Sequence, residues 1–135
     1  MDNLFCLTFY TWPNEDYRES FHIGVFRSCE EAARVEAYYR KRILGFKDYD
    51  CDADIKKIPV MDGIIEGVQK VYRFVGWNEN EEYDEVDIIE SGCYISEELA
   101  QKEMQQVQRK MPRREWVLNG HVIGRCDWEN GFVRE

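Results

Sequence analysis

The sequence predicts an α+β protein of two pseudo-symmetric ββαβ repeats, with mainly antiparallel sheet and two helices, forming one compact domain. The length of 135 residues is that of a single domain, and the hydrophobic fraction of 44% suits a packed core. Each half has an acidic stretch between two strand-like runs, and each then opens a helix with Ser before acidic residues. We therefore assign residues 1–68 to repeat one and residues 69–135 to repeat two.

The first repeat begins with two strand-like runs. Leu4 to Tyr10 is almost entirely apolar, and Ser20 to Phe26 alternates between apolar and polar residues. Trp12 ends the first run, and an acidic, turn-rich stretch follows from Asn14 to Glu19. The pattern indicates two strands joined by a solvated turn.

A helix follows the second strand. Ser28 is a suitable N-cap, and Glu31 lies three residues later, which makes a capping box. The helix is predicted to run to about Leu44. Gly45 then suits the left-handed position after a helix, and Phe46 follows where a Schellman motif places an apolar residue.

A third strand closes the first repeat, and the same order recurs in the second. Asp54 to Val60 is the third strand, and Pro59 favours the edge of a sheet because proline has no backbone N–H to donate. The second repeat has three strand-like runs and a helix that opens at Ser96 and stops at Pro112; the runs are Val71 to Val75, Val86 to Tyr94 and Trp116 to Ile123. Periodicity leaves open whether the repeats share one sheet or pack face to face.

Charge and composition limit the partners. The net charge of −9 disfavours nucleic acid and anionic membranes, and it permits a basic protein surface. The chain has no signal peptide and no apolar run of membrane-spanning length, so we expect a cytoplasmic protein with no membrane partner. The five Cys are odd in number and lack C-x-x-C spacing, so they are predicted to be reduced thiols packed as small hydrophobic residues.

An alternating acidic run resembles the start of a calcium-binding loop. Asp48, Asp50, Asp52 and Asp54 alternate, but the sixth and twelfth positions of an EF-hand loop would be Ala53 and Pro59, where Gly and Glu are required. The EF-hand assignment therefore fails. A looser cation site stays open, but a solvated turn that leads into the third strand explains the run better.

The two histidines allow only weak metal or catalytic arrangements. His22 lies seven residues before Cys29, and His121 lies five before Cys126, but the spacings differ and no C-x-x-C supports zinc. A Cys–His nucleophile pair is possible in principle, yet no nucleotide-binding or hydrolase motif occurs. We therefore expect no metal, no cofactor and no catalytic residues.

Several motifs resemble a small bacterial domain of unknown function, present here in two divergent tandem copies. They are Ile23-Gly24-Val25-Phe26, Ser28-Cys29-Glu30-Glu31-Ala32, Gly45-Phe46-Lys47-Asp48-Tyr49, Ile55 to Val60 and Glu66-Gly67. The second half keeps the closing motif in Asp127-Trp128-Glu129-Asn130-Gly131-Phe132 but lacks the G-F-K-D turn. The resemblance implies a link to bacterial toxin–immunity or phage-defence cassettes. It transfers no functional residue.

Two aromatic and acidic clusters are the predicted binding surface. Trp and Tyr are enriched at binding hot spots, and acidic neighbours attract a basic partner. The predicted contact residues are Trp12, Glu15, Asp16, Tyr17, Trp77, Glu79, Glu81, Glu82 and Tyr83. The structural alternative is that Trp12 and Trp77 close the ends of the core.

The leading functional hypothesis is a non-catalytic protein-binding module, such as an immunity-type inhibitor that covers a basic surface of its target. The alternative is a small-molecule-binding sensor domain with its ligand in a groove between the repeats. An enzyme ranks third and would require His22 or His121 to converge with a Cys or a carboxylate.

Overall fold

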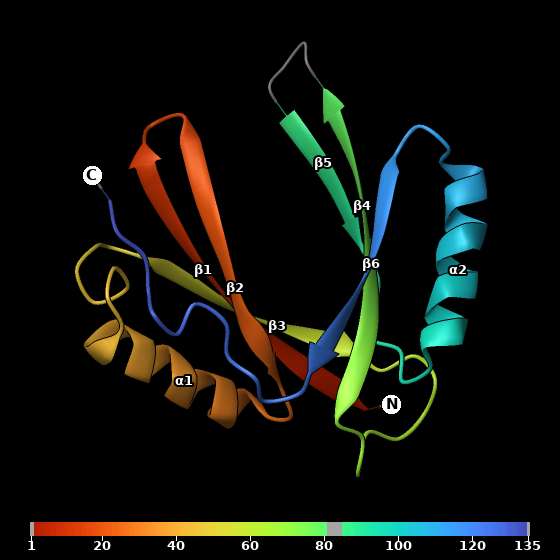
Figure 1. The fold of residues 1–135 in the computed structure, drawn as a ribbon, viewed down its shortest axis with the longest axis horizontal. Helices are drawn as coiled ribbons and strands as arrows, with labels where there is room; N and C mark the ends of the chain where they lie inside the picture. Colours follow the sequence, from red (N-terminus) through yellow and green to blue (C-terminus); the bar gives the residue numbers. More distant parts are fainter. Residues whose placement is uncertain (1, 81–84, 135) are drawn as a thin grey trace. The chain divides into compact units, whose positions relative to one another are not determined.

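The computed structural model describes residues 2–80 and 85–134, and the side chains of residues 2–78 and 88–134. Its elements, in chain order, are β1 (Asn3–Asn14), β2 (Tyr17–Phe26), α1 (Cys29–Arg42), β3 (Asp52–Pro59), β4 (Lys70–Asn80), β5 (Glu85–Glu90), α2 (Glu97–Lys110) and β6 (Glu115–Val122) (Figure 1). Two antiparallel three-stranded sheets and two helices confirm the predicted α+β class.

The two sheets have the same strand order. The first sheet is ordered β2-β1-β3 and the second β5-β4-β6, so in each the first strand of the half lies at the centre. The strand that follows each helix lies at an edge. The edge position that Pro59 predicts is therefore confirmed for β3. The shared order agrees with an internal repeat, although the duplication itself stays a prediction.

Helix α1 begins as predicted and ends two residues early. The hydroxyl of Ser28 accepts a hydrogen bond from the backbone N–H of Glu31 at 3.1 Å, which confirms the N-cap. The helix ends at Arg42 rather than Leu44, because Ile43 already adopts an extended backbone. Gly45 has φ of +87° and lies in the next turn, where its N–H donates to the carboxylate of Asp48 at 2.9 Å.

Helix α2 follows the predicted boundaries. The hydroxyl of Ser96 accepts from the backbone N–H of Leu99 at 3.1 Å, and the helix ends at Lys110, directly before its C-cap Met111. Pro112 follows the cap, as expected of a residue that cannot extend a helix. The carboxylate of Asp62 accepts from the N–H groups that precede the helix, at 2.7 Å and 2.9 Å.

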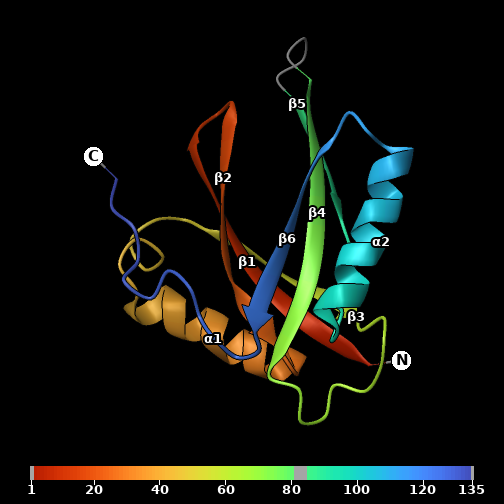
Figure 2. The same ribbon diagram turned by 45° about the vertical axis from the view of Figure 1, so that its right-hand side comes forward.

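The chain divides into two compact units, and neither is a continuous stretch of sequence. The first-sheet unit contains Asn3–Ile58 and Ile123–Glu135, and the second-sheet unit contains Met1–Asp2 and Pro59–Val122. The last residues of the second half thus belong to the unit that the first half mainly builds. We call residues 123–134 the closing segment; it runs along the first-sheet unit between α1 and the β1–β2 hairpin (Figures 1 and 2).

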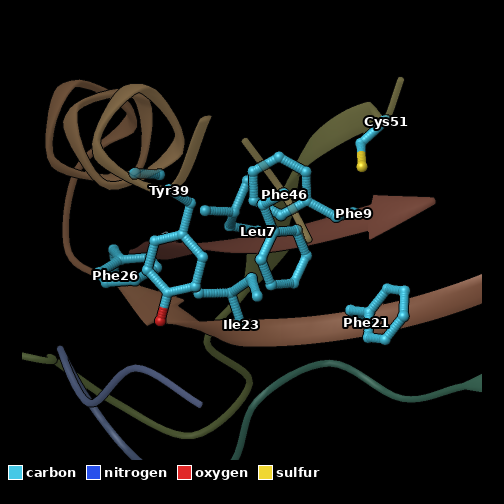
Figure 3. Close-up of a cluster of buried hydrophobic side chains, with 9 residues drawn as sticks. Leu7, Phe9, Phe21, Ile23, Phe26, Tyr39, Phe46 and Cys51 are labelled. Carbon is cyan, nitrogen blue, oxygen red and sulfur yellow. The ribbon is translucent and has the colours of Figure 1, made fainter. Parts of the chain in front are cut away.

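Aromatic side chains dominate the core of the first-sheet unit. Helix α1 supplies Tyr39, and the turn after it supplies Phe46, which lies against Phe9 and Phe21 of the strands (Figure 3). The ring centroids of Phe46 and Phe9 are 4.8 Å apart, and those of Phe46 and Phe21 are 5.4 Å apart. The remaining buried members of this cluster are Leu7, Ile23, Phe26, Ala32 and Cys51.

A smaller cluster forms between the second sheet and α2. Phe74, Tyr94 and Ala100 are its buried members. Half-buried residues extend it along the helix and the sheet: Tyr72, Leu99, Met104, Val107, Trp116 and Leu118. The apolar face of α2 thus packs against β4 and β6.

Candidate functional site

The β1–β2 hairpin carries the first predicted contact cluster at its outer end. Glu15 and Asp16 form a two-residue turn, and the Asn14 side chain accepts from the N–H of Asp16 at 2.9 Å. Trp12 is 55% exposed and Tyr17 is 56% exposed. Aromatic and acidic side chains therefore lie together at the solvent-exposed end of the β1–β2 hairpin.

The position of Trp12 differs from the sequence prediction in two ways. Trp12 lies within β1, which continues to Asn14, rather than at the end of the strand. The pairing register with β2 shifts between Thr11 and Asn14, so Pro13 falls where the ladder is interrupted and needs no N–H donor. With more than half its surface exposed, Trp12 does not close the end of the core.

Trp12 borders two surface hollows. The larger measures about 500 Å³ and is lined by Trp12, Arg40, Phe46, Lys47, Tyr49, Asp50, Cys51 and Asp52. The other, of about 470 Å³, is bounded by Trp12, Asn14 and Glu15. The exposed Trp12 therefore lines both hollows.

The second predicted cluster lies only partly within the described structure. Trp77 lies inside β4 rather than at its end, is half-buried, and borders a hollow of about 290 Å³ with Asn78, Arg113 and Glu115. The backbone of Glu79 pairs with Val86 in the β4–β5 ladder. Its side chain lies outside the described part of the chain, as do residues Glu81, Glu82 and Tyr83. The acidic stretch before Tyr83 is thus strand up to Asn80, where the sequence predicts a loop.

An arginine from the closing segment binds beside the first cluster. Nη2 of Arg134 donates to the hydroxyl of Thr11 and, at 3.3 Å, to the carboxylate of Glu19. Its guanidinium lies 4.9 Å from the ring centre of Tyr49 and 5.5 Å from that of Phe132. Thr11 is fully buried and also donates to Glu19 at 3.3 Å. These residues form a polar and aromatic site for a guanidinium.

Gly131 and Phe132, at the end of the closing motif, pack tightly against the turn after α1. The N–H of Phe132 donates to the carbonyl of Leu44 at 3.0 Å, and its ring stacks on Phe21 with centroids 4.6 Å apart. A Cβ on Gly131 would lie 2.0 Å from the carbonyl oxygen of Leu44, and one on Gly45 would lie 2.6 Å from Phe132. Both glycines are therefore required for the contact.

Sequence reasoning found these two motifs without connecting them. The half that keeps the G-F-K-D turn ends in Glu66-Gly67-Val68, whereas the half that ends in Gly131-Phe132 lacks the turn. In the structure, Gly131-Phe132 of the second half packs against the turn that follows α1 in the first half, and both segments belong to the first-sheet unit. This complementarity was the available signal for the docking.

Tyr39 fixes the middle of the closing segment and is titratable. Its hydroxyl donates to the carbonyl of Asp127 at 2.7 Å. Burial raises the pKa of Tyr39 well above its ordinary value of 10.0, and the neighbouring Cys126 and Glu129 raise this pKa further. Burial likewise raises the pKa of the Cys126 thiol, with a contribution from Glu129.

The raised tyrosine pKa predicts a loss of stability at alkaline pH. Above pH 10 the unfolded chain loses the Tyr39 proton while the folded chain keeps it, so the free energy of unfolding falls by up to about 1.4 kcal/mol per pH unit. Tyr39→Phe should remove this part of the slope. Urea titrations of both chains between pH 9 and 11.5 measure it, and parallel pH profiles would contradict it.

The remaining metal and thiol predictions concern scattered residues. Within residues 2–80 and 85–134, no three His, Cys, Asp or Glu side chains are grouped as a metal site would need. Cys6, Cys51 and Cys93 are buried as predicted, but Cys29 is exposed in the first turn of α1, because it precedes the buried face that begins at Ala32. Neither helix of the described chain is long and apolar enough to cross a membrane.

Comparison of the chain with protein-family models, with curated proteins and with solved structures finds no match. The resemblance to a small bacterial domain therefore stays a prediction that rests on the motifs themselves.

Proposed function

We propose that this protein is a non-catalytic binding module that covers a basic surface on a partner protein, in the manner of an immunity-type inhibitor. The outer end of the β1–β2 hairpin is the centre of the proposed contact surface. The mechanism is steric and electrostatic occlusion. The partner's cations lie near Glu15 and Asp16, while Trp12 and Tyr17 supply apolar contact area.

One observation carries the proposal: two large aromatic side chains, each more than half exposed, flank an acidic turn on a protruding hairpin (Figure 2). Exposed aromatic residues lose hydrophobic stabilisation that burial would give them, and a binding surface recovers it in the complex. The net charge of −9 adds long-range attraction for a basic partner. Trp77, Glu79, Glu81, Glu82 and Tyr83 are proposed as further contact residues on the second-sheet unit, and of these Glu81, Glu82 and Tyr83 lie outside the described residues.

The test compares charge reversal on the hairpin with charge reversal elsewhere. The tagged chain is purified from its host at low and high salt, and a retained basic protein is identified by mass spectrometry. Glu15→Lys with Asp16→Lys is expected to weaken binding at least about 100-fold, because attraction becomes repulsion at the centre of the contact. The matched control is Glu97→Lys with Glu98→Lys, two acidic residues in the first turn of α2.

The outcomes are distinct. A partner that is lost at high salt, and lost from the hairpin variant alone, supports the proposal. A partner whose affinity is the same for both variants would contradict it, provided that the circular dichroism of both variants matches that of the original chain.

A further inference from the structure

We propose that the site occupied by Arg134 and Phe132 is a peptide-binding groove, and that the chain's own closing segment is a built-in competitor for it. The ligand it would take is a segment of a partner protein with the order Gly, aromatic residue, any residue, Arg. The inference rests on the proposed function, because it names the feature of a basic partner that the hairpin region would recognise.

The groove has the parts of a recognition site for such a segment. Thr11 and Glu19 supply oxygen acceptors for a guanidinium, and the Tyr49 ring supplies a face 4.9 Å from it. Arginine fits this arrangement better than lysine, because its planar group can stack and donate at once. The fully buried hydroxyl of Thr11 donates to Glu19 and accepts from this guanidinium, so an occupant of the groove supplies its donor.

The aromatic position of the segment is equally specific. The Phe132 ring lies between Phe21, Phe46 and Tyr49, with centroids 4.6, 5.0 and 5.9 Å away. Removal of this ring would open the aromatic core, so a competing segment must supply an aromatic residue of its own. The preceding residue must be glycine, since a Cβ at Gly131 would meet the Leu44 carbonyl oxygen at 2.0 Å.

The closing segment is suited to release. Only residues 131–134 need to leave the groove, and they lie in no helix or strand. Their exchange breaks the bond from the N–H of Phe132 to the carbonyl of Leu44, which a partner segment of the same order would replace, and it leaves the bonds of Gly124 and Asp127 to β2 in place. Nε of Arg134 is buried without a hydrogen-bond partner in the described part of the chain, so its own fit is incomplete. A tethered segment competes at a high effective concentration, so a partner segment must bind the groove more tightly than Gly131 to Arg134 do.

The experiment uses the full chain and a fluorescein-labelled peptide with the sequence of residues 127–134. Phe132→Ala empties the aromatic position, and this chain is expected to bind the peptide at least about tenfold more tightly than the original chain does. A peptide carrying Arg134→Ala is expected to bind at least about tenfold more weakly than the original peptide. Fluorescence anisotropy measures both.

A second variant keeps the test decisive if Phe132→Ala does not fold. Arg134→Ala removes the guanidinium of the closing segment, which weakens the competitor. The Arg134→Ala chain must therefore also bind the original peptide more tightly than the original chain does. Equal affinity of the two peptides would overturn the proposal, as would failure of the folded Arg134→Ala chain to gain affinity. A wild-type dimer that the peptide dissociates would assign the groove to a second copy of the chain and overturn the partner assignment.

These results are separable from those on the proposed function. Peptide binding does not involve Glu15 or Asp16, so the chain with both changed to Lys is expected to bind the peptide with unchanged affinity. If the peptide binds but the hairpin variant keeps its cellular partner, the groove stands and the proposed function fails. If the peptide does not bind and the hairpin variant loses its partner, the proposed function stands and the groove proposal fails.

Discussion

Gly131→Ala is expected to lower the free energy of unfolding of the first-sheet unit by about 2–4 kcal/mol. Gly131 has φ of +75°, and a Cβ there would lie 2.0 Å from the carbonyl oxygen of Leu44 and 2.8 Å from its carbonyl carbon. The neighbour is backbone, so it cannot rotate away as a flexible side chain can. The alanine variant must therefore displace the closing segment or the turn after α1.

Gly67→Ala is the matched control. Gly67 occupies the corresponding position in the closing motif of the first half and has a similar φ of +78°. A Cβ added to Gly67 would meet no atom of the described residues within 4 Å. Its substitution is expected to cost only the backbone strain of about 1 kcal/mol. Native-state hydrogen exchange reports each unit separately. Equal losses for the two variants would show that the contact with Leu44 contributes nothing.

Phe46→Ala is expected to destabilise the first-sheet unit by about 3–5 kcal/mol, the range for large aromatic residues removed from a core. Phe46 is 2% exposed, and its ring lies within 5.4 Å of the ring centres of Phe9, Phe21, Tyr39 and Phe132. It joins the helix, the sheet and the closing segment. Its loss should therefore also release the segment, seen as faster exchange of the Phe132 amide.

Tyr38→Ala is the control for the loss of an aromatic ring. Tyr38 is next to Tyr39 on α1 but is 57% exposed, so its substitution is expected to change stability by about 0.5 kcal/mol. Urea unfolding measures both variants. A Phe46→Ala chain as stable as the Tyr38→Ala chain would contradict the central role of Phe46 in this core.

The elements with local signals were predicted well. Ser28 and Ser96 cap their helices through their own hydroxyls, and Pro59 lies on an edge strand, because capping and proline chemistry act within a few residues. Strands β1, β2 and β4 are longer than predicted, whereas β5 ends at Glu90 rather than Tyr94. Pro13 and Asn14 are turn formers, yet a register shift between Thr11 and Asn14 accommodates them in the strand.

The sequence predicts the hairpin residues of the candidate site but not the contacts that Arg134 makes beside them. Trp12, Glu15, Asp16 and Tyr17 are neighbours in sequence, so their joint exposure on one hairpin follows from the turn between them. Arg134 reaches Thr11 across more than a hundred residues. No periodicity or cap encodes such a contact, because it depends on which unit receives the closing segment.

The place of the closing segment also sets an order of events during synthesis. Most of the first-sheet unit leaves the ribosome early, but its groove stays open until residues 123–134 emerge, after the whole second-sheet unit has been made. The nascent chain therefore exposes Phe21 and Phe46 throughout that interval. A premature stop codon or a stalled ribosome shortly before the codons for residues 123–134 would leave the first sheet formed but its aromatic core without the cover of Phe132, and so prone to aggregation.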